Sequence, residues 1–253
     1  ARYLRIVVGP AYPQSQPSNP TQQRVPDDRG QVPVFRVTVV GRTTPAINYR
    51  HRGGATTIDF RGTPLLPKSR GEAKVESKQG YIEIEVEFDN LVPATKFGPE
   101  YLTYVMWAIT PEGRATNLGE VLLNEDKSKL NVTTELQAFG LVVTAEPYFA
   151  VSQPSDVVVM ENVIRPDTRG TIEQIDAKYE LLTRGTYLMN TDPDRLVVRR
   201  LDRRVPLELY EARNAVQLSE FAGADRYAAE SFQKASHMLR QAENARERDL
   251  GRR

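Results

Sequence analysis

The stretch GYIEIEVEF, from Gly80 to Phe88, alternates strictly between polar and apolar side chains. Tyr81 and three glutamates fall on one face, while Ile82, Ile84, Val86 and Phe88 fall on the other. Successive side chains of a β-strand point to opposite faces, whereas an α-helix would scatter a period of two around its axis. The stretch therefore predicts a strand with one face in a core and one in water.

Short segments of the same character recur along the middle of the chain. They are rich in β-branched and aromatic residues, are bounded by Gly and Pro, and follow one another at roughly 10- to 15-residue spacing, which is typical of an antiparallel sandwich. We therefore expect a mainly β fold with α, an immunoglobulin-like antiparallel β-sandwich over residues 34–165. The further segments are 34–40, 46–52, 55–62, 117–124, 129–136, 139–147 and 155–165.

The segment YLTYVMWAIT, from Tyr101 to Thr110, differs because apolar groups occupy both of its faces. This pattern indicates a central strand that is covered on both sides. Pro111 and Gly113 in the following TPEG are suited to a tight turn. We expect Trp107, the single tryptophan of the chain, to be a core residue.

Residues 1–33 are rich in Pro, Gln, Ser and Asn and contain few groups to bury. Such a composition cannot offset the entropy of ordering the chain, so we expect an extended Pro/Gln-rich arm. An arm of this kind is able to lie along the sheet edge of a neighbour and to promote assembly.

The end of the chain changes character. Pro206 stands where a helix can begin, no further proline follows, and Gly223 is placed to end one helix before another. We expect a C-terminal α-helical hairpin over 206–253. The connecting segment 166–205 is mixed, because IEQIDAKYELL within it fits a short helix or another strand equally well.

Small and apolar residues recur at steps of three and four along both expected helices, which suits close packing of one helix against another. This helix seam is thin, so a further surface must complete it. Its members are Leu209, Ala212 and Val216 in the first helix and Ala228, Phe232, Ala235, Leu239 and Ala242 in the second.

Composition excludes several classes of function. The 34 Lys and Arg nearly balance the 33 Asp and Glu, so the net charge of +1 gives no reason to expect nucleic acid as a partner. The chain has no cysteine and two histidines, which excludes thiolate catalysis and a multi-histidine metal centre. No nucleophile motif or phosphate loop occurs either. We expect no enzyme, no cofactor, no metal and no membrane span.

A basic cluster is the main candidate for an interaction surface. It lies on the first expected strands and would suit an anion such as phosphate or a lipid headgroup. The alternative is a solvated strand face that is paired with local carboxylates. The cluster consists of Arg42, Arg50, His51, Arg52 and Arg61.

Other polar groups have a simpler interpretation. Asn124–Ser128 and Asn190–Arg195 offer oxygen ligands for calcium, but they lack the spacing of a calcium loop, so turns are favoured. We expect the glutamates of Gly80–Phe88 to pair across strands with lysines such as Lys74 and Lys78.

The segments YVMWAITPEG, FGLVVTAEP (Phe139–Pro147) and QPSDVVV (Gln153–Val159) follow one another in an order that resembles the extracytoplasmic β-sandwich of anti-sigma-K-type regulators. EARNAVQLSEFAGADRYAAESFQKASHMLRQAE is similar to an alanine-rich paired-helix domain of bacterial envelope proteins. Together the two halves resemble the N-terminal part of acidobacterial OmpA-family envelope proteins. In those proteins a peptidoglycan-binding domain follows, and this chain as given does not contain it.

Function follows from these patterns as a set of hypotheses. The main one is a non-enzymatic structural or interaction protein of the bacterial envelope or surface, exported to the periplasm, outer membrane or cell surface. In it the sandwich is a scaffold, and the arm and helices mediate docking to proteins or self-association. One alternative is a glycan- or peptidoglycan-binding module using Tyr101, Tyr104, Tyr148 and Phe149. Another is an anti-sigma-like regulator domain.

Overall fold

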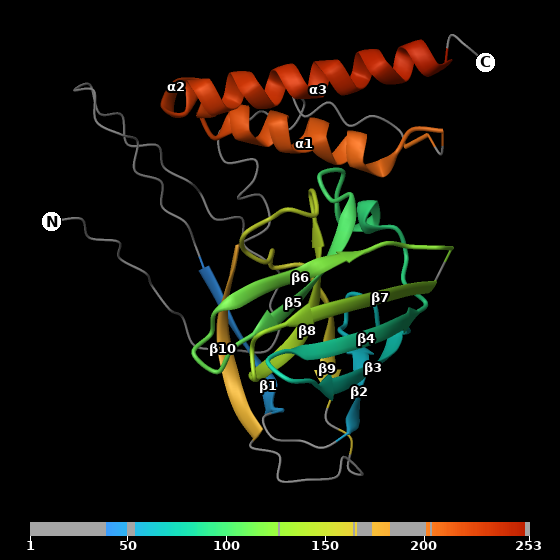
Figure 1. Cartoon of the computed structure of the whole chain (residues 1–253), viewed down its shortest axis with the longest axis vertical. Helices are drawn as coiled ribbons and strands as arrows, with labels where there is room; N and C mark the ends of the chain where they lie inside the picture. Colours follow the sequence, from blue (N-terminus) through green and yellow to red (C-terminus); the bar gives the residue numbers. More distant parts are fainter. Residues whose placement is uncertain are drawn as a thin grey trace, which may run out of the picture.

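The computed structural model describes residues 39–49, 54–125, 127–163, 165, 174–182, 201–202 and 204–250. The fold is mainly antiparallel β-sheet, curled into a nearly closed sandwich, with helices stacked across one end (Figure 1). This confirms the expected class, mainly β with C-terminal helices.

The strands form one continuous hydrogen-bonded system. Its order is β10-β1-β8-β9-β2-β3-β4-β7, and β5 lies between β6 and β8. β8 is central, because it pairs with β5 on one side and with β1 and β9 on the other. The strands are β1 (Val39–Asn48), β2 (Ala55–Gly62), β3 (Arg70–Ser77), β4 (Ile82–Asp89), β5 (Thr103–Ile109), β6 (Ala115–Val121), β7 (Lys127–Thr134), β8 (Ala138–Glu146), β9 (Val158–Val163) and β10 (Gln174–Leu182).

The alternation that predicted β4 is confirmed residue by residue. Ile82, Ile84, Val86 and Phe88 are buried in the main core, while the glutamates between them face outward. The same core receives inward residues from β2, β3, β5 and β8, so it fills the space between the two curved halves of the sheet. Burial of this apolar surface is the main term that stabilises the fold.

β5 is buried along its whole length, as the apolar groups on both of its faces predict. One face enters the main core, while Val105, Trp107 and Ile109 form a second cluster with Val151 and Val158. The turn after β5 is also as expected, with the Gly113 amide bonded to the Thr110 carbonyl at 2.8 Å and a φ of 87° at Gly113. Trp107, on β5, is therefore a core residue that packs against the chain that follows β8.

β3 is a strand that the sequence pattern did not reveal. Its outward positions are charged and its inward positions are small, so it lacks the bulky apolar residues that identify its neighbours. Gly71 on β3 lies between Phe60 of β2 and Phe88 of β4, whose rings meet edge to face with centroids 5.1 Å apart. A Cβ at Gly71 would lie 2.5 Å from Phe88 Cδ1, so the ring contact requires glycine there.

β1 is a single strand across the two segments 34–40 and 46–52 that were expected separately, and it passes through Pro45. Proline has no N–H to donate, so it cannot make a regular pair of backbone hydrogen bonds with a neighbouring strand at this point. Buried Asn162 of β9 donates to the Pro45 carbonyl at 3.1 Å and accepts from the Leu141 amide at 2.9 Å. Asn162 therefore joins β1 and β8 where their ladder is interrupted.

β10 resolves the alternative that was left open for the connecting segment. Residues 174–182 form a strand paired with β1 from Val39↔Leu182 to Ile47↔Gln174, so IEQIDAKYELL contributes a strand and no helix. The sheet therefore extends beyond residue 165, where the sandwich was expected to end. The expected arm, residues 1–33, lies outside the described residues.

The helices are α1 (Leu207–Phe221), a short α2 (Ala224–Tyr227) and α3 (Ala229–Leu250). α1 begins directly after Pro206, and Gly223 adopts the left-handed conformation at the break, as the sequence predicts. α1 lies between the end of the sandwich and α3 (Figure 1). In the part of the chain that is described, no helix combines the length and apolarity needed to cross a membrane.

Replacing Gly71 with alanine should lower the free energy of unfolding by about 1–3 kcal/mol, because the added Cβ overlaps Phe88 and the Glu87 carbonyl. Gly41→Ala in β1 is the matched control, since a Cβ there meets nothing within 4 Å. Urea denaturation of both variants gives the comparison. Equal stability of the two variants would contradict the packing described for Gly71.

Candidate interaction surface on the outer face of β2, β3 and β4

The outward side chains of β2, β3 and β4 form ordered rows of charge. Because neighbouring strands pair without a register shift, residues directly opposite one another line up across the sheet. One row places Arg61 of β2 opposite Arg70 of β3, with Asp89 of β4 next. The row two residues along places Asp59 opposite Glu72, with Glu87 next. A basic pair therefore stands beside a row of three carboxylates.

Only one side chain of the basic pair is hydrogen-bonded to described residues, and its acceptors are backbone carbonyls. Arg70 donates from Nη1 to the carbonyls of Pro67 and Ser69, at 2.9 and 2.7 Å. The Arg61 side chain is exposed and makes no hydrogen bond or ion pair with any other residue that the structure describes. Arg61 therefore presents a guanidinium group whose donors are available to a partner.

The acidic row has a shared counter-ion. Arg165 Nη1 lies 3.6 Å from Asp59 and 3.3 Å from Glu72, so one cation serves two carboxylates. At the far end of the row, Lys129 Nζ on β7 lies 3.1 Å from Glu87. These ion pairs are exposed, and exposed pairs contribute little to folding stability.

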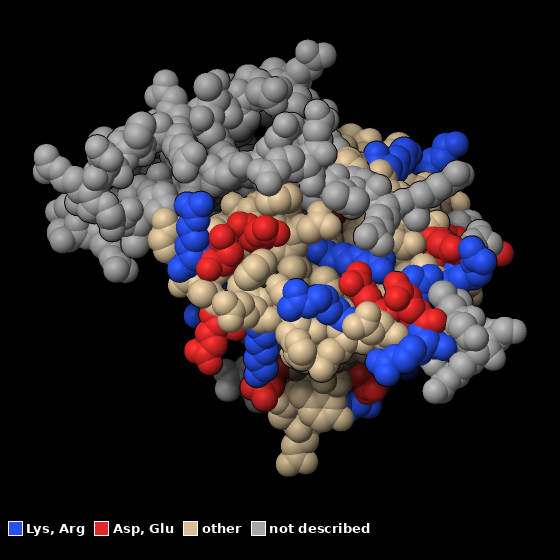
Figure 2. Space-filling model, turned by 90° about the horizontal axis from the view of Figure 1, so that it is seen from above, with Lys and Arg blue, Asp and Glu red and all other residues tan. Residues whose placement is uncertain are grey.

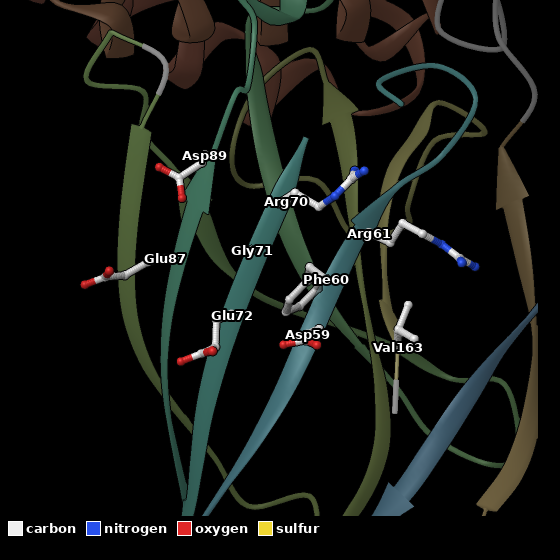
Figure 3. Close-up of a pocket in the computed structure, with 9 residues that line it drawn as sticks. All are labelled: Asp59, Phe60, Arg61, Arg70, Gly71, Glu72, Glu87, Asp89 and Val163. Carbon is white, nitrogen blue, oxygen red and sulfur yellow. The ribbon is translucent and has the colours of Figure 1, made fainter. Parts of the chain in front are cut away.

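The two rows line a shallow groove of about 460 Å³. Figure 3 shows the guanidinium groups of Arg61 and Arg70 extending to the side away from Glu87 and Asp89. The groove is open and six of its nine lining residues are charged, unlike the enclosed, mostly hydrophobic clefts that usually hold small ligands. It is lined by Asp59, Phe60, Arg61, Arg70, Gly71, Glu72, Glu87, Asp89 and Val163.

Further along the same strands, opposite charges are paired. Lys78 contacts Glu76 at 2.7 Å and Glu83 at 3.6 Å, and Lys129 contacts Glu85 at 2.6 Å. The hydrogen bond from Lys129 lowers the pKa of Glu85. Cross-strand pairing was expected, and Lys78 takes part in it. On the face seen in Figure 2 the two signs of charge are likewise interspersed.

The residues of the basic cluster expected from the sequence do not form one surface in the structure, because Arg42 and Arg61 have different surroundings. Arg42 pairs with Glu161 on β9 at 2.5 Å, which agrees with the alternative of local charge pairing. Arg61 lines the groove, and residues 50–52, with Arg50, His51 and Arg52, lie outside the described residues. Arg70 lies directly opposite Arg61 in the groove, and sequence reasoning missed it because β3 was not recognised as a strand.

The contact between α1 and α3 differs from the expected seam. Phe232 and Leu239 are half-buried, whereas Ala228, Ala235 and Ala242 are exposed. Leu239 packs against a cluster that includes Leu209 of α1. The reason is that α3 is rotated about its axis relative to the orientation that the seam predicts. The positions that it half-buries therefore include longer polar side chains. They are Phe232, Ser236, Leu239, Glu243 and Arg246.

On α1 the seam residues divide as well. Leu209 is buried and Val216 is half-buried, but Ala212 is exposed. An ion pair between Arg213 Nε and Glu243 Oε1, at 2.6 Å, joins the two helices beside the apolar contact. The helix contact is therefore partly polar.

α1 is fixed to the sandwich by a buried amide. Asn214 donates from Nδ2 to the carbonyls of Glu100 and Pro147, at 2.7 and 3.0 Å. The apolar part of the junction is formed by Val205, Leu209 and Tyr210, with Leu102 from the sandwich packed against them. The position of α1 therefore depends on the chain that directly follows β8.

That chain is held by a line of hydrogen bonds through the core, which we call the Glu146 clip. The Trp107 indole N–H donates to the Thr144 hydroxyl at 2.8 Å, and the Thr144 hydroxyl donates to the Glu146 carboxylate. The Ser155 amide donates to the same carboxylate at 2.7 Å. All four residues have 0% exposure, and they come from the three segments that carry the resemblance described above.

A second buried carboxyl group lies at the junction of α1 with the sandwich. Glu211 is 2% exposed, and neither of its carboxylate oxygens accepts a hydrogen bond from a residue that the structure describes. Burial is the largest of the effects that raise the pKa of Glu211 to about 9; the nearby carboxylates of Glu120 on β6 and Glu208 add to it, against a smaller effect of the Phe149 backbone. Glu120 itself accepts from the Thr103 hydroxyl at 2.5 Å.

The other candidate residues do not gather into a site. Tyr101 and Tyr104 are buried, so they do not offer rings to a glycan, while Tyr148 is half-buried and Phe149 is exposed. Asn124 forms an isolated bridge with Lys127, which is turn geometry, and 190–195 lies outside the described residues. Within the described ranges no three His, Cys, Asp or Glu side chains are placed to hold a metal ion.

Comparisons with models of protein families, with curated proteins and with solved structures give no match.

Glu211 should make the stability of the helix junction depend on pH. Its pKa is about 9 in the folded chain and near 4.5 when exposed, so the folded state keeps a proton that the unfolded state releases between these values. Stability contributed by this group is therefore present at low pH and lost as pH rises toward 9. Glu211→Gln, which stays neutral, should raise the free energy of unfolding by at least about 1 kcal/mol at pH 8.

The measurement is chemical denaturation of the wild-type chain and Glu211→Gln from pH 5 to pH 9. The difference between the two should widen as pH rises. Exposed Glu220→Gln, on the same helix, is the control and should track the wild type closely. A constant difference across this range would contradict the burial of an ionisable Glu211.

Proposed function

We propose that this protein is a non-enzymatic interaction protein of the bacterial cell envelope. In this proposal the sandwich is a rigid scaffold that binds a partner protein through the groove on β2, β3 and β4, and the helices form a second docking surface. The observation that carries it is the groove itself, where Arg61, whose side chain has no ion-pair partner among the described residues, stands opposite Arg70 and beside three carboxylates on an exposed sheet face.

The scaffold half of the proposal rests on how the buried polar groups are used. The Glu146 clip and Asn162 both bond to backbone or to other buried side chains, and neither opens onto the groove. Buried networks of this kind fix one arrangement of a core. Chemistry at the surface is then left to the exposed charges, which suit recognition of a charged partner.

The envelope half of the proposal rests on the resemblance to the extracytoplasmic sandwich and paired-helix segments of OmpA-family proteins. The segments that carry it meet in the Glu146 clip, so the likeness concerns residues that build the sandwich. The alternative of a glycan-binding module is less favoured, because Tyr101 and Tyr104 are buried.

Cross-linking in the producing bacterium tests the proposal. A photoreactive amino acid in place of Val163, an uncharged residue that lines the groove, should form adducts with an envelope protein, and the chain should fractionate with the envelope. The same amino acid in place of Arg114, an exposed arginine on the turn after β5, is the control and should not form these adducts. Recovery of the chain with cytosolic proteins, or identical adducts from both positions, would reject the proposal.

A further inference from the structure

We propose that the groove on β2, β3 and β4 binds an extended segment of its partner in which an acidic and a basic residue stand two positions apart. This inference rests on the proposed function, since it names the chemistry of the partner at the same surface. It is drawn from the placement of charge in the groove and from the spacing of the strands.

In the groove, side chains of like charge lie opposite each other on neighbouring strands and repel each other. Arg61 and Arg70 are directly opposite each other, and so are Asp59 and Glu72. Like charges in this position on neighbouring strands destabilise a sheet. A partner that places an opposite charge over each row relieves both repulsions, which gives the bound state an advantage that the free chain lacks.

The compensation within the chain is incomplete on both rows. Arg61 has no partner among the described residues, and Arg70 bonds only to backbone carbonyls. Asp59 and Glu72 divide a single guanidinium group, that of Arg165, at 3.6 and 3.3 Å. Each row therefore keeps bonding capacity for a charged group from outside.

The separation of the rows selects the shape of the partner. The basic and acidic rows are two residues apart along β2, which is roughly 7 Å in a strand. An extended peptide repeats its side chains on one face at the same interval. A segment lying along β2 and β3 thus places an acidic side chain over Arg61 and a basic side chain over Glu72 at the same time.

Partners with a single sign of charge fit less well. A run of acidic residues, or the phosphates of a nucleic acid, would meet the carboxylates of Asp59, Glu72, Glu87 and Asp89. A run of basic residues would meet Arg61 and Arg70. Only alternating charge satisfies both rows, so the groove discriminates by pattern and not by net charge.

Titration of the 253-residue chain with short blocked peptides, followed by amide NMR shifts, tests this inference. The probe is TETKT, and TETET and TKTKT are the single-sign controls; threonine favours the extended form. Exposed ion pairs are weak and are screened by salt, so we expect weak binding that fades at high salt. TETKT should bind at least threefold more tightly than either control and shift amides of β2 and β3.

Charge-reversal variants sharpen the test. Arg61→Glu combined with Arg70→Glu should lose the preference for TETKT and bind TKTKT best, whereas Arg114→Glu should behave as the wild type. Glu72→Lys provides an independent variant in case the double variant does not fold, and it should shift the preference toward TETET. Dispersed amide spectra confirm that each variant is folded.

The outcomes separate this inference from the proposed function. Equal affinity for the three peptides, or an unchanged preference in a folded charge-reversal variant, overturns the inference. If position 163 still forms adducts with an envelope protein in that case, the proposed function stands and the partner is recognised by another chemistry.

Discussion

The Glu146 clip is the interaction on which the rest of the structure depends. It places a carboxylate with 0% exposure under the chain that leaves β8 and uses it to accept from both Thr144 and Ser155. A buried carboxylate is costly unless hydrogen bonds compensate it, so the groups around it have little freedom to rearrange. Trp107 extends the clip to β5 through its indole N–H. Sheet and following loop are therefore fixed to each other.

This fixed loop explains how a partly polar pair of helices can be placed on a β-sandwich. Asn214 of α1 bonds to the Pro147 carbonyl, one residue after Glu146, and Asn117 of β6 holds the next turn by bonding to Phe149 and Val151. α1 thus docks on backbone that is already ordered. Buried Glu211 opposes this docking as pH rises, so the junction is less secure than the sandwich below it.

Sequence periodicity predicted individual strands, turns and helix breaks. It could not predict which residues lie opposite each other, because that depends on the register between strands. β4, β5, the turn at Gly113 and the helix break at Gly223 followed from alternation, apolar runs and glycine placement. β3 was missed because Gly71 and Ala73 leave its inner face without bulky groups. Without β3, the opposition of Arg61 and Arg70 was invisible, and with it the groove. The predicted helix seam differs from the observed contact because small residues identify the contact face of a helix only when the rotation of that helix about its axis is known.

The most direct test of the scaffold is Thr144→Val, which keeps the shape of the side chain but removes the acceptor of Trp107 and the donor to Glu146. We expect the free energy of unfolding to fall by about 2–3 kcal/mol, and amides of α1 to exchange faster with solvent than in the control Thr133→Val, whose side chain is exposed on β7. Emission from Trp107, the single tryptophan, should change as well. Unaltered stability and unaltered protection of α1 in Thr144→Val would contradict the dependence of the helices on the clip.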